Sequence, residues 1–309
     1  MDLLDVSDVP QNLRLYGGLS CKKIGITLGN TNYLLKLPGN LKGRSLHNVE
    51  LSYSNSPVCE YIGSEIFRML GVPTHKVILG KRGEKVVALC EDFVISGKRL
   101  YEFREIKATF EPAFIDEFGN ETDGMGSSLK EALLVIQEHP VLKRIPNVEY
   151  FFWQMFIIDA FIGNPDRNNG NWGILIQDSK DVSLAPVYDN GNCLNDKWDD
   201  GKILKFMTDK QLLINEAYKG KVCFFTNEKG KKINPFQFIE AKSSSMCTCV
   251  LGDLVKSLAR EWDNICTLIN NVNVISDVRK EFCKTILRMR KEKLEKIAGR
   301  HGTENLSAF

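Results

Sequence analysis

One apolar segment and the polar loop after it constrain the fold of this chain more than any other feature. Residues 148–162 are strongly apolar, which predicts a buried helix, and a Gly-Asn-Pro sequence from residue 163 stops it. Two polar residues, Gln154 and Asp159, interrupt the apolar run, which is also too short to span a bilayer. The sequence therefore predicts a core helix with an acid- and amide-rich loop directly after it.

Three side chains around this loop are spaced like metal ligands and a proton acceptor. Asp166 lies in the loop, Asn171 lies five residues later at the start of a predicted strand, and Asp189 ends the next predicted strand. If residues 172–176 and 182–187 pair as a hairpin, the start of the first strand lies beside the end of the second. Asn171 and Asp189 can then face the same metal ion. Oxygen ligands suit Mg²⁺, and a further carboxylate can accept the proton of an attacking hydroxyl. The catalytic D-x-x-x-x-N and metal-binding D-x-G of protein kinases are related in this way, which predicts phosphoryl transfer.

The loop has two other interpretations. Asp and Asn side chains in loops commonly form turns, and one such cluster alone is weak support for a metal site. Asp166 and Asn168 also begin like an EF-hand, but the sixth position is Asn171 rather than Gly and the twelfth is Gln177 rather than Glu. Because Asp189 is in place after the hairpin, the kinase-like interpretation is favoured over a simple turn.

The N-terminal part supplies one lysine in an apolar strand. Two short apolar runs flank a Gly-Asn-Thr-Asn turn, and Lys36 lies within the second of them. Such a lysine either extends outward to solvent or holds the phosphates of ATP, paired with a glutamate on the following helix. That helix is predicted over residues 57–70 and carries Glu60 and Glu65, either of which can be the partner.

Two further segments would complete a nucleotide site. A glycine-rich loop before the first of these strands can bring backbone amides to phosphates, or it is a hairpin turn with solvated lysines. The residues assigned to this loop are Gly17, Gly18, Ser20, Lys22 and Lys23. The segment between the predicted lobes is either a hinge that offers backbone groups to adenine or a simple connector. The residues assigned to this hinge are Glu91, Asp92 and Phe93.

The pattern of predicted elements divides the chain into two lobes. Residues 1–93 form a small β-rich lobe, and residues 94–309 form a larger, mainly helical one. Strands are predicted at residues 24–28, 33–37, 77–79 and 85–90 of the first lobe. Helices are predicted at 131–138, 148–162, 255–270 and 278–298, with irregular structure or short elements over 100–128. The expected fold class is α+β, a two-lobed protein-kinase-like fold with ATP between the lobes.

Composition narrows the class of protein. The chain has 41 basic and 39 acidic residues, whereas a dedicated nucleic-acid binder carries a marked basic excess. Its nine scattered cysteines are typical of reduced cytosolic thiols rather than of a disulfide framework. No basic stretch leads into an apolar run at the N-terminus, so no secretory signal is expected. We expect a cytoplasmic protein by default, without nucleic-acid or membrane partners, although non-classical export would leave no trace.

Five motifs together resemble those of the HipA-like serine/threonine kinases, atypical kinases whose site is also similar to that of phosphatidylinositol kinases. They lie at residues 16–26, 33–38, 59–71, 163–173 and 185–191, and the last hundred residues match only loosely. The resemblance implies a kinase that uses ATP and Mg²⁺, with Asp166 as catalytic base and Asn171 and Asp189 as metal ligands. It also makes Lys36 the ATP lysine and favours Glu60 as its partner.

The sequence departs from the family pattern at two positions. Asn168 stands where many members have His, and Asn190 replaces the Phe of Asp-Phe-Gly, so a switch based on that Phe is not expected. The long N-terminal extension of the HipA toxin is absent as well, so partnership with a DNA-binding antitoxin is not expected.

Two alternatives to a protein kinase stay open at this point. A phosphoinositide or small-molecule kinase uses the same parts, and a non-catalytic nucleotide-binding scaffold would keep only the fold. A lipid kinase needs a basic patch beside apolar anchors, but the last predicted helix has its basic residues on one side and its apolar residues on the other. Those basic residues are Lys280, Lys284, Arg288 and Lys291. We therefore expect a protein Ser or Thr acceptor, including the chain's own hydroxyls in segments such as 127–128 and 243–245.

Overall fold

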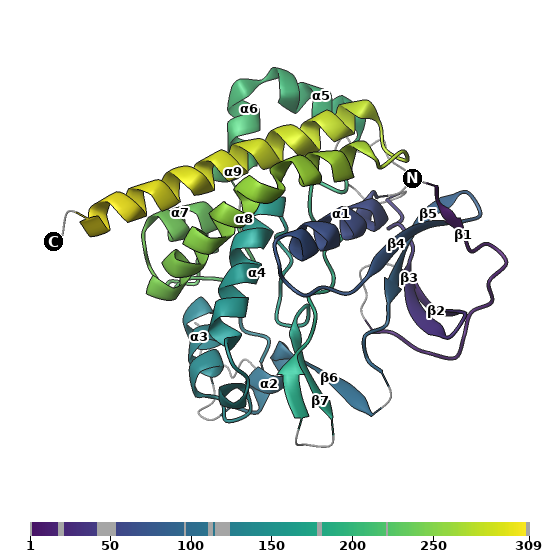
Figure 1. Cartoon of the computed structure of the whole chain (residues 1–309), viewed down its shortest axis with the longest axis horizontal. Helices are drawn as coiled ribbons and strands as arrows, with labels where there is room; N and C mark the ends of the chain where they lie inside the picture. The colour runs from purple at the N-terminus through teal and green to yellow at the C-terminus, as the bar shows by residue number, and fades with distance from the viewer. Residues whose placement is uncertain are drawn as a thin grey trace.

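The structure is a computed structural model. It describes residues 2–17, 22–41, 54–95, 97–110, 114, 124–177, 181–220 and 222–306, with side chains up to residue 300. Gly18 and Ser20 of the predicted phosphate loop lie outside the described residues. In the described part, a β-rich N-terminal lobe joins a mainly helical C-terminal lobe, which confirms the expected two-lobed α+β fold (Figure 1).

The N-terminal lobe is built on a five-stranded sheet in the order β1-β4-β5-β3-β2. Its strands are β1 (Leu4–Asp5), β2 (Lys23–Leu28), β3 (Thr31–Lys36), β4 (Val77–Arg82) and β5 (Lys85–Glu91). Neighbouring strands pair antiparallel, except that β1 runs parallel to β4. The predicted strands are confirmed, and the turn between β2 and β3 uses Gly29 at a φ of 57°. Lys36 therefore lies at the end of an interior strand.

Helix α1 (Ser56–Met69) packs on β4 and β5 and confirms the predicted helix. Its apolar residues Val58, Ile62 and Ile66 recur at i, i+4 spacing and are buried, which fixes the face that the helix turns inward. Helix α8 (Ser245–Asn270) packs against α1 from the other lobe. A buried glutamate on α1, Glu60, thus lies between the sheet and the helical lobe.

A three-stranded antiparallel sheet lies below the first one and belongs to the C-terminal part (Figure 1). It consists of β6 (Lys98–Glu102), β7 (Gly173–Gln177) and β8 (Asp181–Leu184), with β7 in the middle. Strand β6 and helix α2 (Phe103–Ala108) occupy the start of the region that we expected to be irregular or to hold short elements. The strand has no strong local signal because its partner β7 lies far downstream. Strand β8 ends earlier than predicted, and Val187 instead bridges to Thr74 of the N-terminal lobe.

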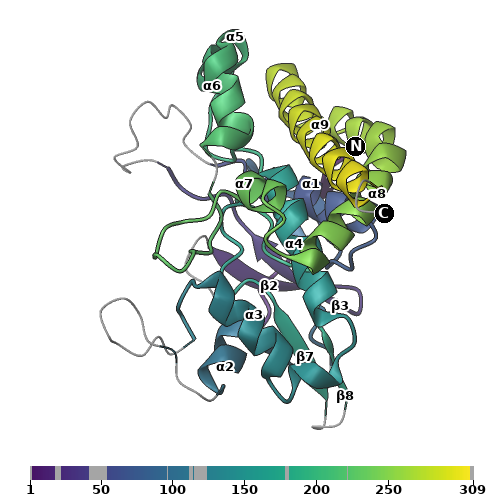
Figure 2. The same ribbon diagram turned by 90° about the vertical axis from the view of Figure 1, so that its left-hand side faces the viewer.

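The helical lobe packs around α4 (Val148–Ile162), whose bounds agree with the prediction. Its other helical elements are α3 (Leu129–Glu138), η1 (Leu142–Arg144), α5 (Asp200–Thr208), α6 (Lys210–Ile214), the π-helical η2 (Asn215–Lys219), α7 (Pro235–Glu240), α8 (Ser245–Asn270) and α9 (Asp277–Leu306). Helices α8 and α9 pack on α4 and on each other, while α5 and α6 project from one end (Figure 2). Helix α8 begins earlier than predicted because Ser244 caps it and its first turns bury Val250 and Leu251.

Helix α4 ends where only glycine fits. Gly163 has a φ of 70°, and a Cβ there would lie 2.5 Å from a guanidinium nitrogen of Arg290 in α9. The fully buried Arg290 donates to backbone carbonyls of Phe161 and of η2, which anchors this end of α4. The loop that carries Asp166 therefore starts from a fixed point in the core.

Two expectations drawn from composition concern the described residues directly. Eight cysteines lie in the described residues, and none of these eight is joined to another by a disulfide. Among the described helices, none combines the length and the apolar character that a membrane crossing requires.

Candidate active site

A cleft of about 360 Å³ is lined by residues of both lobes. Of the residues selected from the sequence, its lining includes Gly17, Lys23, Lys36, Glu91, Asp92, Phe93, Asp166, Asn171 and Asp189. Glu60 is fully buried directly behind Lys36. Lys23 donates to the Gly17 carbonyl at 3.2 Å, whereas Lys22 is exposed and lies away from the cleft lining. The structure thus brings the proposed base, metal ligands and hinge together and leaves Lys22 outside.

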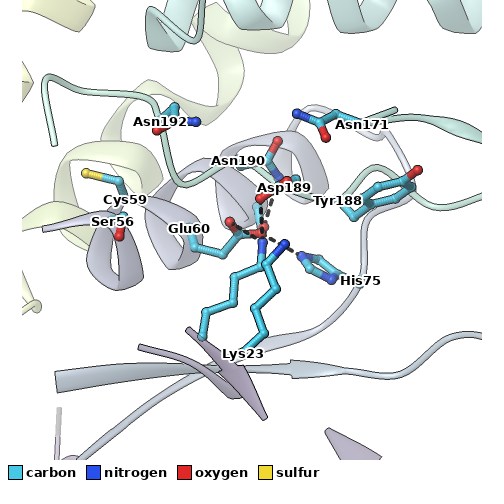
Figure 3. A network of polar contacts seen from close by, with 12 residues as sticks. Lys23, Ser56, Cys59, Glu60, His75, Asn171, Tyr188, Asp189, Asn190 and Asn192 are labelled. Carbon is cyan, nitrogen blue, oxygen red and sulfur yellow. Dashed lines mark hydrogen bonds and ion pairs between the residues drawn. The ribbon is translucent and has the colours of Figure 1, made fainter. Parts of the chain in front are cut away.

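Lys36 is the centre of a buried charge cluster. Its Nζ donates to Glu60 Oε2 at 2.9 Å and to Asp189 Oδ1 at 2.8 Å. Figure 3 shows Glu60, His75 and Asp189 turned toward a common centre. Burial disfavours the charged ammonium, but the two carboxylates outweigh it and raise the pKa of Lys36 well above its usual value. Lys36 in turn lowers the pKa of Asp189, so a charged network spans the two lobes.

Glu60, rather than Glu65, pairs with Lys36 in the structure. Glu65 instead forms an ion pair with Arg68 of the same helix at 2.7 Å. The second oxygen of Glu60, Oε1, lies 3.0 Å from Nε2 of the buried His75. Burial alone would raise the pKa of Glu60, but Lys36 and His75 lower it, so the carboxylate stays charged.

Glu60, His75 and Cys90 also place donor atoms within 4.8 Å of one another, a spacing that can suit a metal ion. The Lys36 ammonium already lies 2.9 Å from Glu60 and balances the charge there. A second cation at this point would be repelled by the lysine, so we interpret the group as part of the ion-pair network.

The loop between α4 and β7, residues 163–172, holds Asp166 by its side chain and by its backbone. The carboxylate oxygens accept amide hydrogens from Asn168 at 3.0 Å and from Asn192 at 2.7 Å. The backbone N–H donates to Asn164 Oδ1 at 3.1 Å, and the carbonyl accepts from Asn171 Nδ2 at 2.7 Å. Since Asn171 uses its amide nitrogen in this way, its amide oxygen is the atom that can face a cation.

Arg167 ties the loop that carries Asp166 to the segment that carries Asp189. Its guanidinium pairs with Asp159 of α4 at 2.9 and 3.1 Å, a bidentate contact. The remaining N–H groups donate to the carbonyls of Asn171 and Tyr188 and to the side chain of Asn190. Burial disfavours the charge, but Asp159 outweighs it and raises the pKa of Arg167. This buried cation therefore fixes the backbone beside both proposed metal ligands.

The residues after Tyr188 form a polar link to α1. Asp189 has a φ of 59°, in the left-handed region that Asp tolerates better than most residues. Asn190 is fully buried and donates to Ser64 Oγ of α1 at 2.9 Å. A Cβ at Gly191 would lie 3.1 Å from Glu60 Oε2, so loop and helix approach closely. The position of the missing Phe thus carries hydrogen bonds instead of aromatic packing.

The hinge is fastened to the N-terminal segment by Asp92. Its carboxylate accepts the Tyr16 hydroxyl at 2.7 Å and pairs with Arg14 at 2.5 Å. Burial and the bond to Asp92 raise the pKa of Tyr16, which keeps the hydroxyl protonated as a donor. Asp92 therefore stabilises the hinge with its side chain.

One backbone N–H group of the hinge is not used by the hydrogen bonds described here. The N–H groups of Glu91 and Asp92 donate to carbonyls of the N-terminal lobe, and that of Val94 donates to the Asp92 carboxylate at 2.8 Å. Over the described residues 91–94, Phe93 is thus the residue whose N–H these bonds do not use. Its ring packs on Tyr188, with 5.6 Å between centroids, and both residues line the cleft.

Comparison with known proteins identifies the family. No protein-family model matches the chain. The serine/threonine-protein kinase CtkA of Helicobacter pylori is 31% identical over 286 residues, which are 92% of this chain and 83% of CtkA. The chain belongs to the HipA-like serine/threonine kinases. The resemblance inferred from its five motifs is thereby confirmed.

Two solved structures have a similar fold. The crystal structure of the H. pylori proinflammatory kinase CtkA has a TM-score of 0.85 at 27% identity and covers 97% of this chain and 98% of that one. HipA of Shewanella oneidensis MR-1, solved with HipB and operator DNA, has a TM-score of 0.55 at 14% identity. That match covers 89% of this chain and 62% of the other and shows the fold alone.

Some residues of this HipA-like site had been missed in the sequence. Arg167 and Tyr188 lie inside the selected motifs and Asn192 directly follows one, so their position next to Asp166 and Asp189 is the signal that could have found them. His75 has no such signal. It reaches Glu60 because its backbone N–H pairs with the Val187 carbonyl at 3.2 Å, a contact between segments far apart in sequence.

Proposed function

We propose that this chain transfers the γ-phosphoryl group of ATP to serine or threonine hydroxyls of proteins, its own among them. The observation that carries the proposal is the meeting of Lys36, Asp189 and Asp166 in one cleft, although they come from three separate segments. Phosphoryl transfer needs a cation for the phosphates, oxygen ligands for a metal and a proton acceptor, and these residues supply all three. The relation to CtkA supports the same class of reaction.

ATP lies between an N-terminal lobe of residues 1–93 and a C-terminal lobe of residues 94–309. The adenine ring faces the hinge, where Phe93 offers its N–H, and Leu34 and Leu100 line the cleft beside it. The phosphates extend toward Lys36, whose buried ammonium is a fixed positive charge.

The oxygen donors near Asp189 suit Mg²⁺. Asp189 uses Oδ1 for Lys36, which leaves Oδ2, and Asn171 presents its amide oxygen. Carboxylate, amide and phosphate oxygens are the ligands that Mg²⁺ prefers. The bound ion would neutralise charge on the β- and γ-phosphates, while Asp189 links that charge to Lys36.

Asp166 accepts the proton of the attacking hydroxyl. As the hydroxyl oxygen bonds to the γ-phosphorus, its O–H bond breaks toward Asp166 and the bond from phosphorus to the ADP oxygen breaks. Asp166 lines the cleft with both carboxylate oxygens held by amides, which supports a fixed direction of approach. Catalysis of this kind comes mainly from positioning and electrostatics.

The charges on α9 favour a protein acceptor over a lipid. Lys280, Lys284 and Lys291 pair with acidic residues of the same helix, at 3.3, 2.5 and 2.8 Å. A lipid kinase must attract an anionic surface, and a basic face that carries its own counter-charges attracts such a surface weakly.

Exposure separates the proposed autophosphorylation segments. Ser243 and Ser245 are exposed at the start of α8. Ser127 is half-buried against Thr226, and Ser128 is half-buried as the cap of α3. We therefore favour the segment at residues 243–245 as an acceptor.

The proposal is tested by labelling with γ-radiolabelled ATP and Mg²⁺ in three reactions: the protein alone, with a generic protein substrate, and with phosphoinositide vesicles. We expect label on protein serine or threonine, located by phosphopeptide mass spectrometry, and none on lipid. Unlabelled protein together with strong vesicle labelling would make the lipid kinase the better assignment. Binding of ATP without any transfer would favour the non-catalytic scaffold.

A further inference from the structure

Two amide side chains from different segments hold the Asp166 carboxylate. Asn168, in the catalytic loop, donates to Oδ1 at 3.0 Å. Asn192, three residues beyond Asp189, donates to Oδ2 at 2.7 Å. Figure 3 shows Asn192 and Asn171 to the left and right of Asn190, above the charge cluster. Each oxygen of the proposed base thus has one amide donor.

The segment that carries Asn192 is anchored to two helices. Cys193 donates its thiol hydrogen to the Cys59 carbonyl of α1 at 3.3 Å. The N–H of Leu194 donates to the carbonyl of Ile162, the last residue of α4, at 3.1 Å. Asn192 is half-buried between these anchors and the cleft, so its amide is presented from a fixed backbone.

We propose that Asn192 is a positioning residue for phosphoryl transfer, which fixes the direction of the Asp166 carboxylate together with Asn168. This inference rests on the proposed function because it requires Asp166 to be the base. A carboxylate has about four lone-pair sites. Two amide hydrogens occupy one site on each oxygen and leave the others for the substrate hydroxyl. With one donor the group can rotate about its bonds, whereas two donors on opposite oxygens hold its plane.

The chemical type of the donors supports this role. An amide is neutral, so it orients a carboxylate without the strong attraction of a lysine or arginine, which would make the carboxylate a weaker proton acceptor. Asn192 also follows Asp189 within one short segment. The base and a proposed metal ligand are therefore set by the same stretch of backbone.

The test measures kcat, KM for ATP and half-saturation by Mg²⁺ in Asn192→Ala and Asn192→Leu. We expect kcat to fall roughly 10- to 100-fold, the effect of one hydrogen bond to a charged group. KM for ATP and the Mg²⁺ half-saturation should stay within about three-fold, because Asn192 contacts the base rather than the nucleotide. Asn192→His can donate a ring N–H from a similar place and should recover part of kcat.

Asn195→Gly is the matched control. Asn195 donates to Glu216 at 2.6 Å rather than to Asp166, and glycine accepts its φ of 56°, so kcat should stay at the wild-type value. If Asn192→Ala and Asn192→Leu both unfold below the assay temperature, Asn192→His alone decides the question. A retained kcat in Asn192→His supports the inference, and a large loss of kcat overturns it.

Two results would overturn the inference directly. One is an unchanged kcat in folded Asn192→Ala. The other is a joint change of KM and Mg²⁺ half-saturation, which would assign Asn192 to nucleotide or metal binding. Full transfer by Asp166→Ala would instead overturn the proposed function itself, so the two failures are distinguishable.

Discussion

Two buried cations close to Asp166, Lys36 and Arg167, hold carboxylates in similar ways but differ in what surrounds them. Lys36 lines the cleft, and one of its partners, Asp189, has a side chain that is 23% exposed. Arg167 is enclosed by Asp159 and by backbone carbonyls on both sides of the site. Lys36 lies at the cleft surface, where a ligand can contact both the lysine and its partner Asp189. Arg167 instead has its hydrogen-bond partners within the protein and fixes the backbone.

Alanine at each cation tests this contrast most strongly. Lys36→Ala should lower phosphoryl transfer at least ~10²-fold, because the phosphates lose a fixed positive charge. Arg167→Ala should instead lower the free energy of unfolding by about 3–5 kcal/mol, because Asp159 stays buried without its ionic partner. Radiolabel transfer and urea unfolding measure the two effects. Lys36→Ala also leaves the buried Glu60 without its lysine, but His75 stays 3.0 Å from that carboxylate, so its loss of stability should be smaller. The contrast fails if both variants lose the same amount of stability.

Asp189→Asn separates the metal ligand from the ion pair. A neutral amide is a poorer ligand for a hard dication, so the Mg²⁺ concentration for half-maximal activity should rise steeply. The variant should remain folded because Lys36 keeps Glu60 as a partner. The measurement is a Mg²⁺ titration of transfer at saturating ATP. An unchanged Mg²⁺ dependence would make Asp189 a structural turn residue.

Asp196 is a buried carboxyl group that, unlike the partners of Lys36 and Arg167, forms no ion pair with a buried cation in the described part of the chain. Its Oδ2 has no hydrogen-bond partner among the described residues, and burial raises its pKa from 3.8 to about 6. Between about pH 4 and pH 6 the folded state therefore keeps the Asp196 proton, whereas the unfolded state releases it. The protonated Asp196 is compatible with burial, so the folded state has its full stability below about pH 4 and loses part of it as the pH rises through about 6.

Asp196→Asn should remove the loss of stability that ionisation of Asp196 causes, because an amide stays neutral at every pH. At pH 7.5 the variant should be more stable than wild type, by up to about 3 kcal/mol, whereas at pH 4 the two should be similar. Urea unfolding at both pH values checks this. Equal stability at pH 7.5 would mean that Asp196 finds a partner in solution.

The loop lysines should give the smallest effect. Lys23 lines the cleft but is partly exposed, so Lys23→Ala should raise KM for ATP a few-fold, since an exposed charge is screened. Lys22→Ala, the matched control outside the cleft, should change KM less. Losses as large as that of Lys36→Ala in either variant would show that the phosphate lysine is misplaced. Steady-state ATP titrations measure all three.

The fold was largely predictable because its signals are local. The apolar run of α4 and its glycine stop gave bounds that agree with the structure, since burial and capping act over a few residues. Strand β6 was not clearly predicted, because it is defined by its pairing with β7, and such pairing leaves little mark on a short strand's own sequence.

The residues of the site also divide into those with a local sequence signal and those without one. Lys36, Asp166 and Asp189 could be selected because each lies in a motif with a chemical purpose. His75 could not be derived from spacing, because its contact with Glu60 depends on how the segment after α1 packs against distant residues. Helical periodicity left Glu60 and Glu65 both open as partners of Lys36, whereas the family resemblance favoured Glu60, with which Lys36 pairs in the structure. Side chains recruited by packing carry no periodicity of their own.

The most direct test of the account is Asp166→Ala, measured for MgATP binding by calorimetry and for phosphoryl transfer by radiolabel. The account predicts affinity within a few-fold of wild type, because Asp166 faces the acceptor hydroxyl and Lys36 holds the nucleotide. It also predicts that transfer falls by at least ~10²-fold, the usual contribution of a general base. Wild-type turnover in this variant would contradict the assignment of Asp166 as the base, and loss of MgATP binding would place Asp166 among the nucleotide ligands instead.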